Sequence, residues 1–336
     1  MKPLALSLLI FTAALAQMRV VTLPGKSPLV SFRIVFTAGS VTDPPDKAGA
    51  AYLTAMMLAH GGTREMTYRD VLDAMFPMAG SLDAQVDKEM VSFYGATHTD
   101  NLEHYYHIVR AMLLDPGWRE EDFQRVKQDA IHLLEVNLRN NDEELAKELL
   151  EEDIYRGMPY GEYSAGSISS LRNITLDDLK HFYRAHYSQA NLILGIAGGY
   201  SPEFLERMKQ DFRRLPEGGG FRPRDKVPSL IDHNRATIIE KRTRPVAISI
   251  GFPTLGTRAN PDYPALLLVS SYLGQHRSGN GVLFQRMREK RGLNYGDYAY
   301  IEYFPRGMFQ FEPSPNLARH YQTFQVWIRP VEPENA

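Results

Sequence analysis

The sequence predicts an α+β fold made of two homologous α/β halves, each a mixed sheet with helices packed on one face, the second half being truncated. Three observations indicate this class. Segments with apolar residues at period 2 alternate along the chain with segments at helical spacing. A strand, turn and helix pattern that begins at Val30 returns at Val246. The length of 336 residues, 43% of them hydrophobic, suits about two domains.

The first half begins with a clear strand and two helices. Alternating apolar side chains over 30–36 predict a strand, and the almost wholly apolar segment 49–59 predicts a buried helix. Thr67, with Asp70 three residues later, predicts the start of a second helix that ends before Pro77. The same rules predict strands at 90–96 and 192–197, and helices at 102–113, 121–155 with a break near 140–141, 175–187 and from 201 onward.

The second half repeats this beginning. After a segment rich in glycine and proline, apolar residues alternate again, and each lies at one constant offset from an apolar residue of the first strand. The matching pairs are Val30 and Val246, Phe32 and Ile248, Ile34 and Ile250, and Phe36 and Phe252. The segment ALLLVSSYLG then stands where AAYLTAMMLA stood. The shared offset indicates a duplicated domain whose second copy lacks the long helical part.

This repeat sets the predicted organisation of the chain. It consists of a signal peptide at 1–16, a first domain at 17–215, a linker at 216–230 and a second domain at 231–336.

The N-terminal residues predict export. Lys2 precedes an apolar run from Leu4 to Leu15, and the small residues around Leu15 fit a cleavage site before Gln17. The alternative is a buried first strand or helix of the mature fold. The run is shorter than a membrane-spanning helix, and no later stretch reaches about 18 apolar residues. We therefore expect a periplasmic or secreted protein without a membrane span.

Composition excludes several classes of function. The chain has 38 Lys and Arg against 40 Asp and Glu, a net charge of −2, whereas nucleic-acid binding needs a basic surface. It has no Cys, which excludes disulfide scaffolds, thiolate metal sites and cysteine nucleophiles. No G-x-S-x-G motif supports a self-sufficient serine hydrolase.

Several motifs together resemble the pitrilysin/insulinase-type zinc metallopeptidases, in the branch of mitochondrial processing peptidase and its bacterial relatives. The resemblance covers nearly the whole mature chain, and its fold of two homologous α/β halves agrees with the duplication. The motifs that carry it are Lys47-Ala48-Gly49, Leu58, Gly62-Thr63, Pro159-Tyr160-Gly161, Gly166, Ile174-Thr175, Asp178-Leu179, Phe182-Tyr183, Tyr187, Asn191, Gly198, Leu283-Phe284, Arg288-Glu289 and Arg291-Gly292-Leu293-Asn294-Tyr295.

The zinc motif of that family is degenerate here. The resemblance implies an H-x-x-E-H sequence on the first helix, in which two His bind zinc and the Glu is the general base. The matching positions hold Tyr52, Ala55 and Met56, which cannot do this. The expected third ligand falls near His132 and Glu135, and one late ligand cannot hold a catalytic zinc ion. We therefore expect no metal bound by this chain.

A second group of histidines offers an alternative metal site. His98, Glu103, His104 and His107 lie close together in sequence, with the last two at i,i+3. Tyr106 and Val109 take the apolar stripe of the predicted helix, so these histidines are expected on its solvated side, where the sequence places no ready carboxylate partner.

The Arg and Tyr of the family's active site are retained. Arg288 lies near the end of a predicted helix that Gly292 terminates, and Tyr295 follows the turn, so the two can converge. The resemblance implies that they reach the zinc site of the other half, where they bind substrate and the developing oxyanion. From the residues alone, the favoured explanation is structural, with cations that complement a helix end and an aromatic side chain in a strand. The resemblance reverses that preference.

The resemblance therefore implies a non-catalytic subunit of a heterodimeric zinc metalloendopeptidase. A homologous partner would carry the zinc, and this chain would supply Arg288 and Tyr295 for peptide hydrolysis. The segment Ser81-Leu82-Asp83-Ala84 matches the edge strand that pairs with peptide substrate in the zinc-bearing half. The alternative is a catalytically dead peptidase scaffold that acts as a peptide-binding or structural assembly protein.

Overall fold

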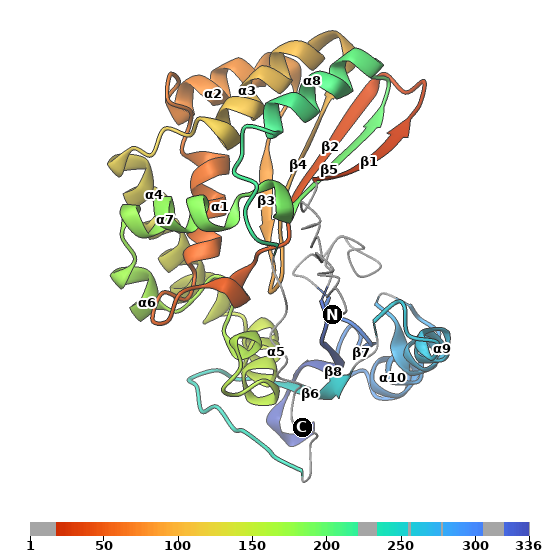
Figure 1. Ribbon diagram of the computed structural model, residues 1–336. Coiled ribbons are helices and arrows are strands. Elements are labelled where there is room, and N and C mark those ends of the chain that lie inside the picture. Colours follow the sequence, from red (N-terminus) through yellow and green to blue (C-terminus); the bar gives the residue numbers. More distant parts are fainter. Residues whose placement is uncertain (1–17, 221–233, 255–256, 277, 305–318, 336) are drawn as a thin grey trace, which may run out of the picture.

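Two α/β units follow one another along the chain, each with its own sheet (Figure 1). The computed structural model describes residues 18–220, 234–254, 257–276, 278–304 and 319–335. The predicted signal peptide and most of the predicted linker therefore lie outside the described residues. Among the described helices, none is both long and apolar enough to cross a membrane.

The first unit contains a mixed sheet of five strands in the order β1-β5-β2-β4-β3. Only the pairing of β1 with β5 is parallel. Ile34 in the centre of the sheet pairs with Phe93 on one side and with Leu194 on the other. The strands are β1 (Arg19–Pro24), β2 (Leu29–Phe36), β3 (Asp83–Val86), β4 (Val91–His98) and β5 (Leu192–Gly198).

Helices cover one face of this sheet. They are α1 (Ala50–His60), α2 (Tyr68–Met75), α3 (Leu102–Leu114), α4 (Glu120–His132), α6 (Ile168–Asn173), α7 (Leu176–His186) and α8 (Pro202–Phe212). The helix α5 (Asp142–Ile154) instead packs on the sheet of the second unit. A π-helical segment, η4 (Leu133–Leu138), follows α4, and Asn141 caps α5 at the predicted break. The predicted start of α2 is confirmed, because Thr67 and Asp70 form a reciprocal capping box.

The core of the first unit lies between β2 and α1. Every second side chain of β2 is buried, from Val30 to Phe36, as the period-2 pattern predicts. The helix α1 is covered on several sides because it packs against α3, α4, α7 and β3. Side chains on the other face of β2, such as Arg33, are half-buried, and Arg33 lies over the ring of Tyr94 at 4.6 Å. The predicted arrangement of a mixed sheet with helices on one face is confirmed.

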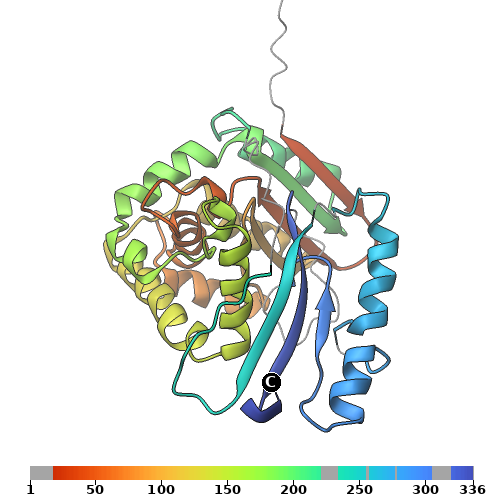
Figure 2. The same cartoon turned by 90° about the horizontal axis from the view of Figure 1, so that it is seen from below.

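The second unit repeats the central order of the first sheet. Its strands β6 (Val246–Thr254), β7 (Tyr298–Tyr300) and β8 (Gln322–Val331) form an antiparallel sheet in the order β6-β8-β7, which matches β2-β4-β3 (Figure 2). Val326 of β8 pairs with Ile250 and with Ala299, as Phe93 of β4 pairs with Ile34 and Ala84. The matching topology supports the duplication inferred from the constant offset between the two halves.

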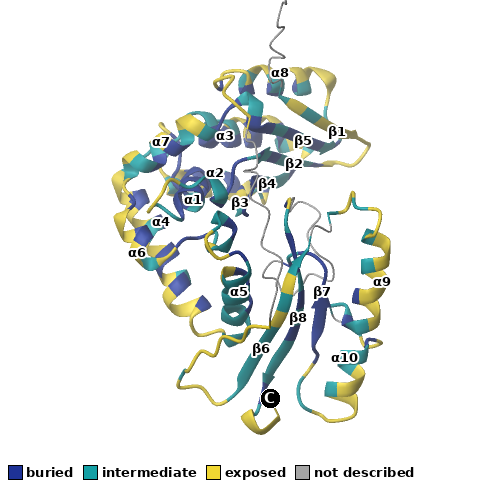
Figure 3. Cartoon of the chain, turned by 60° about the horizontal axis from the view of Figure 1, so that its bottom comes forward, coloured by how far each residue is buried: buried dark blue, intermediate teal, exposed yellow. Residues whose placement is uncertain are grey.

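Helices of the second unit leave more apolar surface exposed. They are α9 (Tyr263–Gly274) and α10 (Val282–Phe284), which continues into the π-helical segment η7 (Gln285–Glu289). Leu268 and Tyr272 on α9 are 74% and 70% exposed, whereas the corresponding helix α1 is largely buried (Figure 3). In the described part of the second unit, α9 packs on β7 and α10 and has no covering helices like those around α1.

A buried ion cluster joins the two units. Arg319 donates to both carboxylate oxygens of Asp87, at 2.6 and 2.7 Å, and to Glu151 at 3.0 Å. Asp87 lies in the β3–β4 turn and Glu151 on α5, while Arg319 precedes β8. Burial alone would lower the pKa of Arg319, but these two carboxylates hold it well above its ordinary value. The phenol of Tyr155 also donates to the carbonyl of Gln322 at 2.9 Å.

Candidate functional site

The helix α1 is built as a core helix at the degenerate zinc positions. Ala55 is fully buried, and Tyr52 and Met56 are half-buried against the same core. A methyl group, a phenol and a thioether at these positions supply hydrocarbon contacts in place of the imidazole and carboxylate ligands of a zinc centre. Across the described residues, no three His, Asp or Glu side chains converge as a metal-binding group.

The N-terminus of α1 is held by a buried carboxyl group. Asp43 accepts hydrogen bonds from the backbone N–H groups of Gly49 and Ala51, each at 2.7 Å. Gly49 has φ +98°, a left-handed conformation that a side chain would strain. Burial raises the pKa of Asp43 to about 7, against the opposing effect of the two N–H donors.

The other sequence candidates for metal ligands lie apart. His132 and Glu135 are exposed at the end of α4 and in η4, and the Arg172 guanidinium lies 3.7 Å from the Glu135 carboxylate. His104 and His107 are exposed on α3, as their position outside the apolar stripe predicts. His98 accepts a hydrogen bond from the N–H of Asp100 at the end of β4.

The segment Ser81-Leu82-Asp83-Ala84 lies at one edge of the first sheet. Strand β3 pairs only with β4 among the described strands, so its outer edge is open for main-chain hydrogen bonding. Leu82 is buried, Asp83 is exposed, and the carbonyl of Ser81 accepts a hydrogen bond from the buried Tyr105 at 2.7 Å. The strand also packs beside α1, so the edge and the degenerate zinc positions are neighbours.

Arg288 and Tyr295 lie side by side on the second unit. The guanidinium carbon of Arg288 is 5.4 Å from the ring centre of Tyr295 and 4.8 Å from that of Phe284. Gly292 ends the helical segment with φ +65°, and its N–H donates to the carbonyl of Arg288 at 2.8 Å. Tyr295 is 77% exposed, so its hydroxyl is available to another molecule.

These two residues do not meet the degenerate zinc positions within the chain. The helix α1 packs on α3, α4, α7 and β3, whereas α10 and η7 pack on each other and α9 (Figures 1 and 2). The chain therefore presents the Arg/Tyr pair and the edge strand β3 as two separate surfaces.

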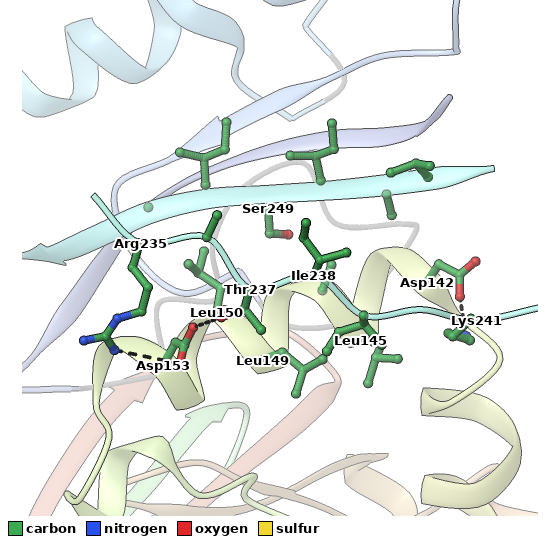
Figure 4. Close-up of a pocket in the computed structure, with 18 of the residues that line it drawn as sticks. Asp142, Leu145, Leu149, Leu150, Asp153, Arg235, Thr237, Ile238, Lys241 and Ser249 are labelled. Atoms are coloured by element: carbon green, nitrogen blue, oxygen red, sulfur yellow. Dashed lines mark hydrogen bonds and ion pairs between the residues drawn. The ribbon is translucent and has the colours of Figure 1, made fainter. Parts of the chain in front are cut away.

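Two features of the structure were missed by the sequence analysis. One is the buried cluster around Arg319, whose partners are 168 and 232 residues away in sequence. The other is a groove of about 1,210 Å³ between α5 and β6 (Figure 4). Neither feature has a local pattern in the sequence, because both form only where distant segments meet.

Comparison with known proteins gives a family for both units. The sequence model of insulinase (peptidase family M16) matches residues 19–166, and that of the peptidase M16 inactive domain matches residues 173–319. The chain belongs to the M16 metallopeptidase family.

Individual relatives agree with this assignment. An uncharacterized zinc protease of Streptomyces coelicolor is 26% identical over 307 residues, covering 86% of this chain and 66% of that protein. The beta subunit of the mitochondrial-processing peptidase of Caenorhabditis elegans is 22% identical over 179 residues, covering 53% of this chain and 39% of that protein. The chain thus spans about two thirds of the length of the Streptomyces relative.

Solved structures show the same fold. A peptidase M16 inactive domain from Pseudomonas fluorescens has a TM-score of 0.78 at 22% identity, covering 94% of this chain and 73% of that one. A protease from Helicobacter pylori has a TM-score of 0.77 at 18% identity, covering 93% of this chain and 72% of that one.

Proposed function

We propose that this chain is a non-catalytic subunit of an exported, heterodimeric zinc metalloendopeptidase. A homologous partner would hold the zinc ion and the general base, and this chain would supply Arg288 and Tyr295 to the partner's active site. The observation that carries the proposal is the pairing of these side chains on an exposed surface, 5.4 Å apart, in a chain whose zinc positions hold Tyr52, Ala55 and Met56.

The chemistry of the pair suits peptide hydrolysis. Arg288 offers a charged fork of donors that can bind a substrate carbonyl or carboxylate. A tyrosine hydroxyl such as that of Tyr295 can donate to the oxyanion of the tetrahedral intermediate. The carboxylate of Glu289 is 4.0 Å from the Arg288 guanidinium, so this ion pair is weak and the cation can take a further partner.

Two further observations support the proposal. The beta subunit of a processing peptidase among the relatives is by its name one chain of an assembly, and other relatives are named zinc proteases. The edge of β3, with the segment 81–84, offers a place where an extended peptide could add as a strand.

The test measures peptidase activity of the complex purified from its source with its natural partner. We expect Arg288→Ala and Tyr295→Phe each to lower kcat by about 10- to 1,000-fold, as loss of one oxyanion donor does. Arg286→Ala and Tyr272→Phe are matched controls, because both side chains are exposed, Arg286 in the same segment η7 and Tyr272 on α9.

Three results would contradict the proposal. The first is unchanged kinetics in both variants. The second is peptide cleavage by this chain alone with stoichiometric zinc. The third is a partner that gains no peptidase activity in its presence, which would favour a catalytically dead scaffold for peptide binding or assembly.

A further inference from the structure

A short turn carries Tyr295 from the helical segment η7 to strand β7. Before Tyr295, the N–H of Leu293 donates to the carbonyl of Met287 at 3.0 Å, which fixes the chain to the end of η7. After it, the N–H of Gly296 donates to the side-chain oxygen of Asn294 at 3.0 Å, as in an Asx turn. Tyr295 therefore lies between residues that are hydrogen-bonded on both sides of it.

Two side chains tie this turn to strand β8. The amide nitrogen Nδ2 of Asn294 donates to Oδ1 of Asp297 at 2.8 Å and to the carbonyl of Arg329 at 3.3 Å. The N–H of Arg329 donates to the same Oδ1 of Asp297 at 2.8 Å. We call the side chains of Asn294 and Asp297, together with the backbone of Arg329, the clamp. It joins both ends of the turn to a single residue of β8.

Stability alone does not explain the acidic member of the clamp. Asp297 is fully buried, and burial raises its pKa against the opposing effect of the Arg329 N–H and the Asn294 amide. Its second oxygen, Oδ2, is buried without a hydrogen-bond partner among the described residues. The charged groups beside it are Arg329 and Glu143 of α5, which pair with each other at 3.2 Å. An unpaired buried oxygen costs free energy, so the position of Asp297 calls for another reason.

The side chain of Tyr295 has little to hold it in place by itself. It is 77% exposed, and its ring centre lies 5.4 Å from the guanidinium carbon of Arg288. An exposed side chain keeps such a position only where the backbone beneath it is fixed. In the described chain, the clamp is what fixes that backbone on the side of β7.

We propose that Asn294 and Asp297 are positioning residues, which hold the ring of Tyr295 beside the guanidinium of Arg288. The catalytic consequence rests on the proposed function. A hydroxyl that must meet an oxyanion in a partner's active site gains from a fixed starting position, because a displacement of about 1 Å can lower a rate by 100-fold. The clamp would provide that position before the partner and the substrate bind.

The first test places a fluorotyrosine at position 295 of the full chain and records its fluorine NMR signal. Arg288→Ala gives the signal of a ring without its neighbour. We expect Asn294→Ala and Asp297→Ala to move the signal to that position. Asp297→Asn should keep the signal of the unmodified chain, because an amide oxygen can still accept from both donors. Asn280→Ala, at an exposed position of the second unit, is the matched control and should leave the signal unchanged.

Amide hydrogen exchange tests the contacts of the clamp one by one. Asn294→Ala removes the acceptor of the Gly296 N–H, and Asp297→Ala removes the acceptor of the Arg329 N–H. We expect the exchange of the corresponding amide to accelerate by about tenfold or more in each variant. Asn294 is only half-buried, so Asn294→Ala carries the test by itself should Asp297→Ala not fold.

Kinetics of the complex with the zinc-bearing partner give the last measurement. We expect Asn294→Ala and Asp297→Ala to lower kcat by about 10- to 100-fold with KM changed less than about threefold, and Asp297→Asn to restore most of the rate. The proposal is overturned by an unchanged fluorine signal in both alanine variants. It is also overturned by unchanged kcat where Tyr295→Phe lowers kcat. If Tyr295→Phe itself has no effect, the proposed function fails, and the fluorine signal still decides whether the clamp places Tyr295.

Discussion

Asp43 shows how a single carboxyl group couples helix structure to pH. It accepts two short hydrogen bonds from the N-terminal turn of α1, yet it is so far from water that burial raises its pKa to about 7. In the unfolded chain the same group titrates near 3.8. The folded state therefore retains a proton that the unfolded state loses.

This difference predicts that stability falls as pH rises. A pKa raised on folding contributes stability below the unfolded value, and that contribution is lost as pH rises through 7. Between pH 5 and pH 8 we expect the free energy of unfolding to decrease by about 2–3 kcal/mol through this group. In Asp43→Asn the decrease should be smaller by that amount. Urea unfolding of the unmodified protein and of Asp43→Asn at pH 5 and pH 8 measures this decrease in the free energy of unfolding. An equal decrease in the two proteins would contradict the role of Asp43.

The pair Arg288 and Tyr295 illustrates a different residue-scale effect. Its geometry depends on Gly292, whose left-handed φ turns the chain sharply after η7 and returns Tyr295 to the side of Arg288. The sequence predicted that the two side chains come together, because a glycine that ends a helix can be recognised from the neighbouring residues alone. The use of the pair by a partner subunit remains the proposal that kinetics must test.

At the scale of elements, α1 and α9 show that similar sequences can have different surroundings. Both helices are apolar nearly all round, and the repeat relates them. The first is enclosed by α3, α4 and α7, while α9 exposes Leu268 and Tyr272. A helix that is apolar on all sides needs covering elements, and exposed apolar surface of this kind marks an interaction site or an aggregation risk.

The composition of α1 predicts that metal ions do not change the stability of the isolated chain. Tyr52, Ala55 and Met56 provide no imidazole or carboxylate, so zinc has no ligand set on this helix that would favour the folded state. We expect excess chelator, and equally added zinc, to leave the free energy of unfolding of the isolated chain unchanged. Chemical denaturation with and without chelator tests this. A loss of stability on chelation, or stoichiometric zinc in the purified chain, would show that the expectation is wrong.

For the whole molecule, the ion cluster at Arg319 joins the two units. Its side chain and the two carboxylates are almost fully removed from water, with exposed fractions of 2–3%. Lys88 lies buried in the same region, and burial lowers its pKa. Charges at this depth are stable only when paired, so each member depends on the others.

Loss of one member is therefore expected to be costly. We expect Arg319→Ala to lower the free energy of unfolding by about 3–5 kcal/mol, because it leaves Asp87 and Glu151 buried without a counter-ion. Arg244→Ala is the matched control. Arg244 pairs with Glu332 at 3.1 Å with 84% of its side chain exposed, and such a surface pair contributes about 0–1 kcal/mol. Denaturant titration of the unmodified chain, Arg319→Ala and Arg244→Ala measures these free energies of unfolding. Equal losses of stability in the two variants would contradict the role of Arg319 as the buried counter-ion.

Periodicity and repetition in the sequence determined much of the fold. Each of the signals used spans only a few neighbouring residues or compares two such stretches. They are the alternation from Val30 to Phe36, the capping pair Thr67 and Asp70, and the constant offset between the two halves. The degenerate zinc helix and the retained Arg/Tyr pair were likewise readable residue by residue. The domain boundaries and the roles of the site residues remain predictions.

Only the tertiary structure decided how the two units meet. Arg319 contacts Asp87 across 232 residues of chain, and the groove is lined jointly by α5, the segment 235–240 and β6. The pairing of side chains distant in sequence depends on the packing of whole elements, which no local pattern records. Local hydrogen bonding and hydrophobic periodicity specify strands and helices. Buried ion pairs and grooves, in contrast, form only when those elements pack together.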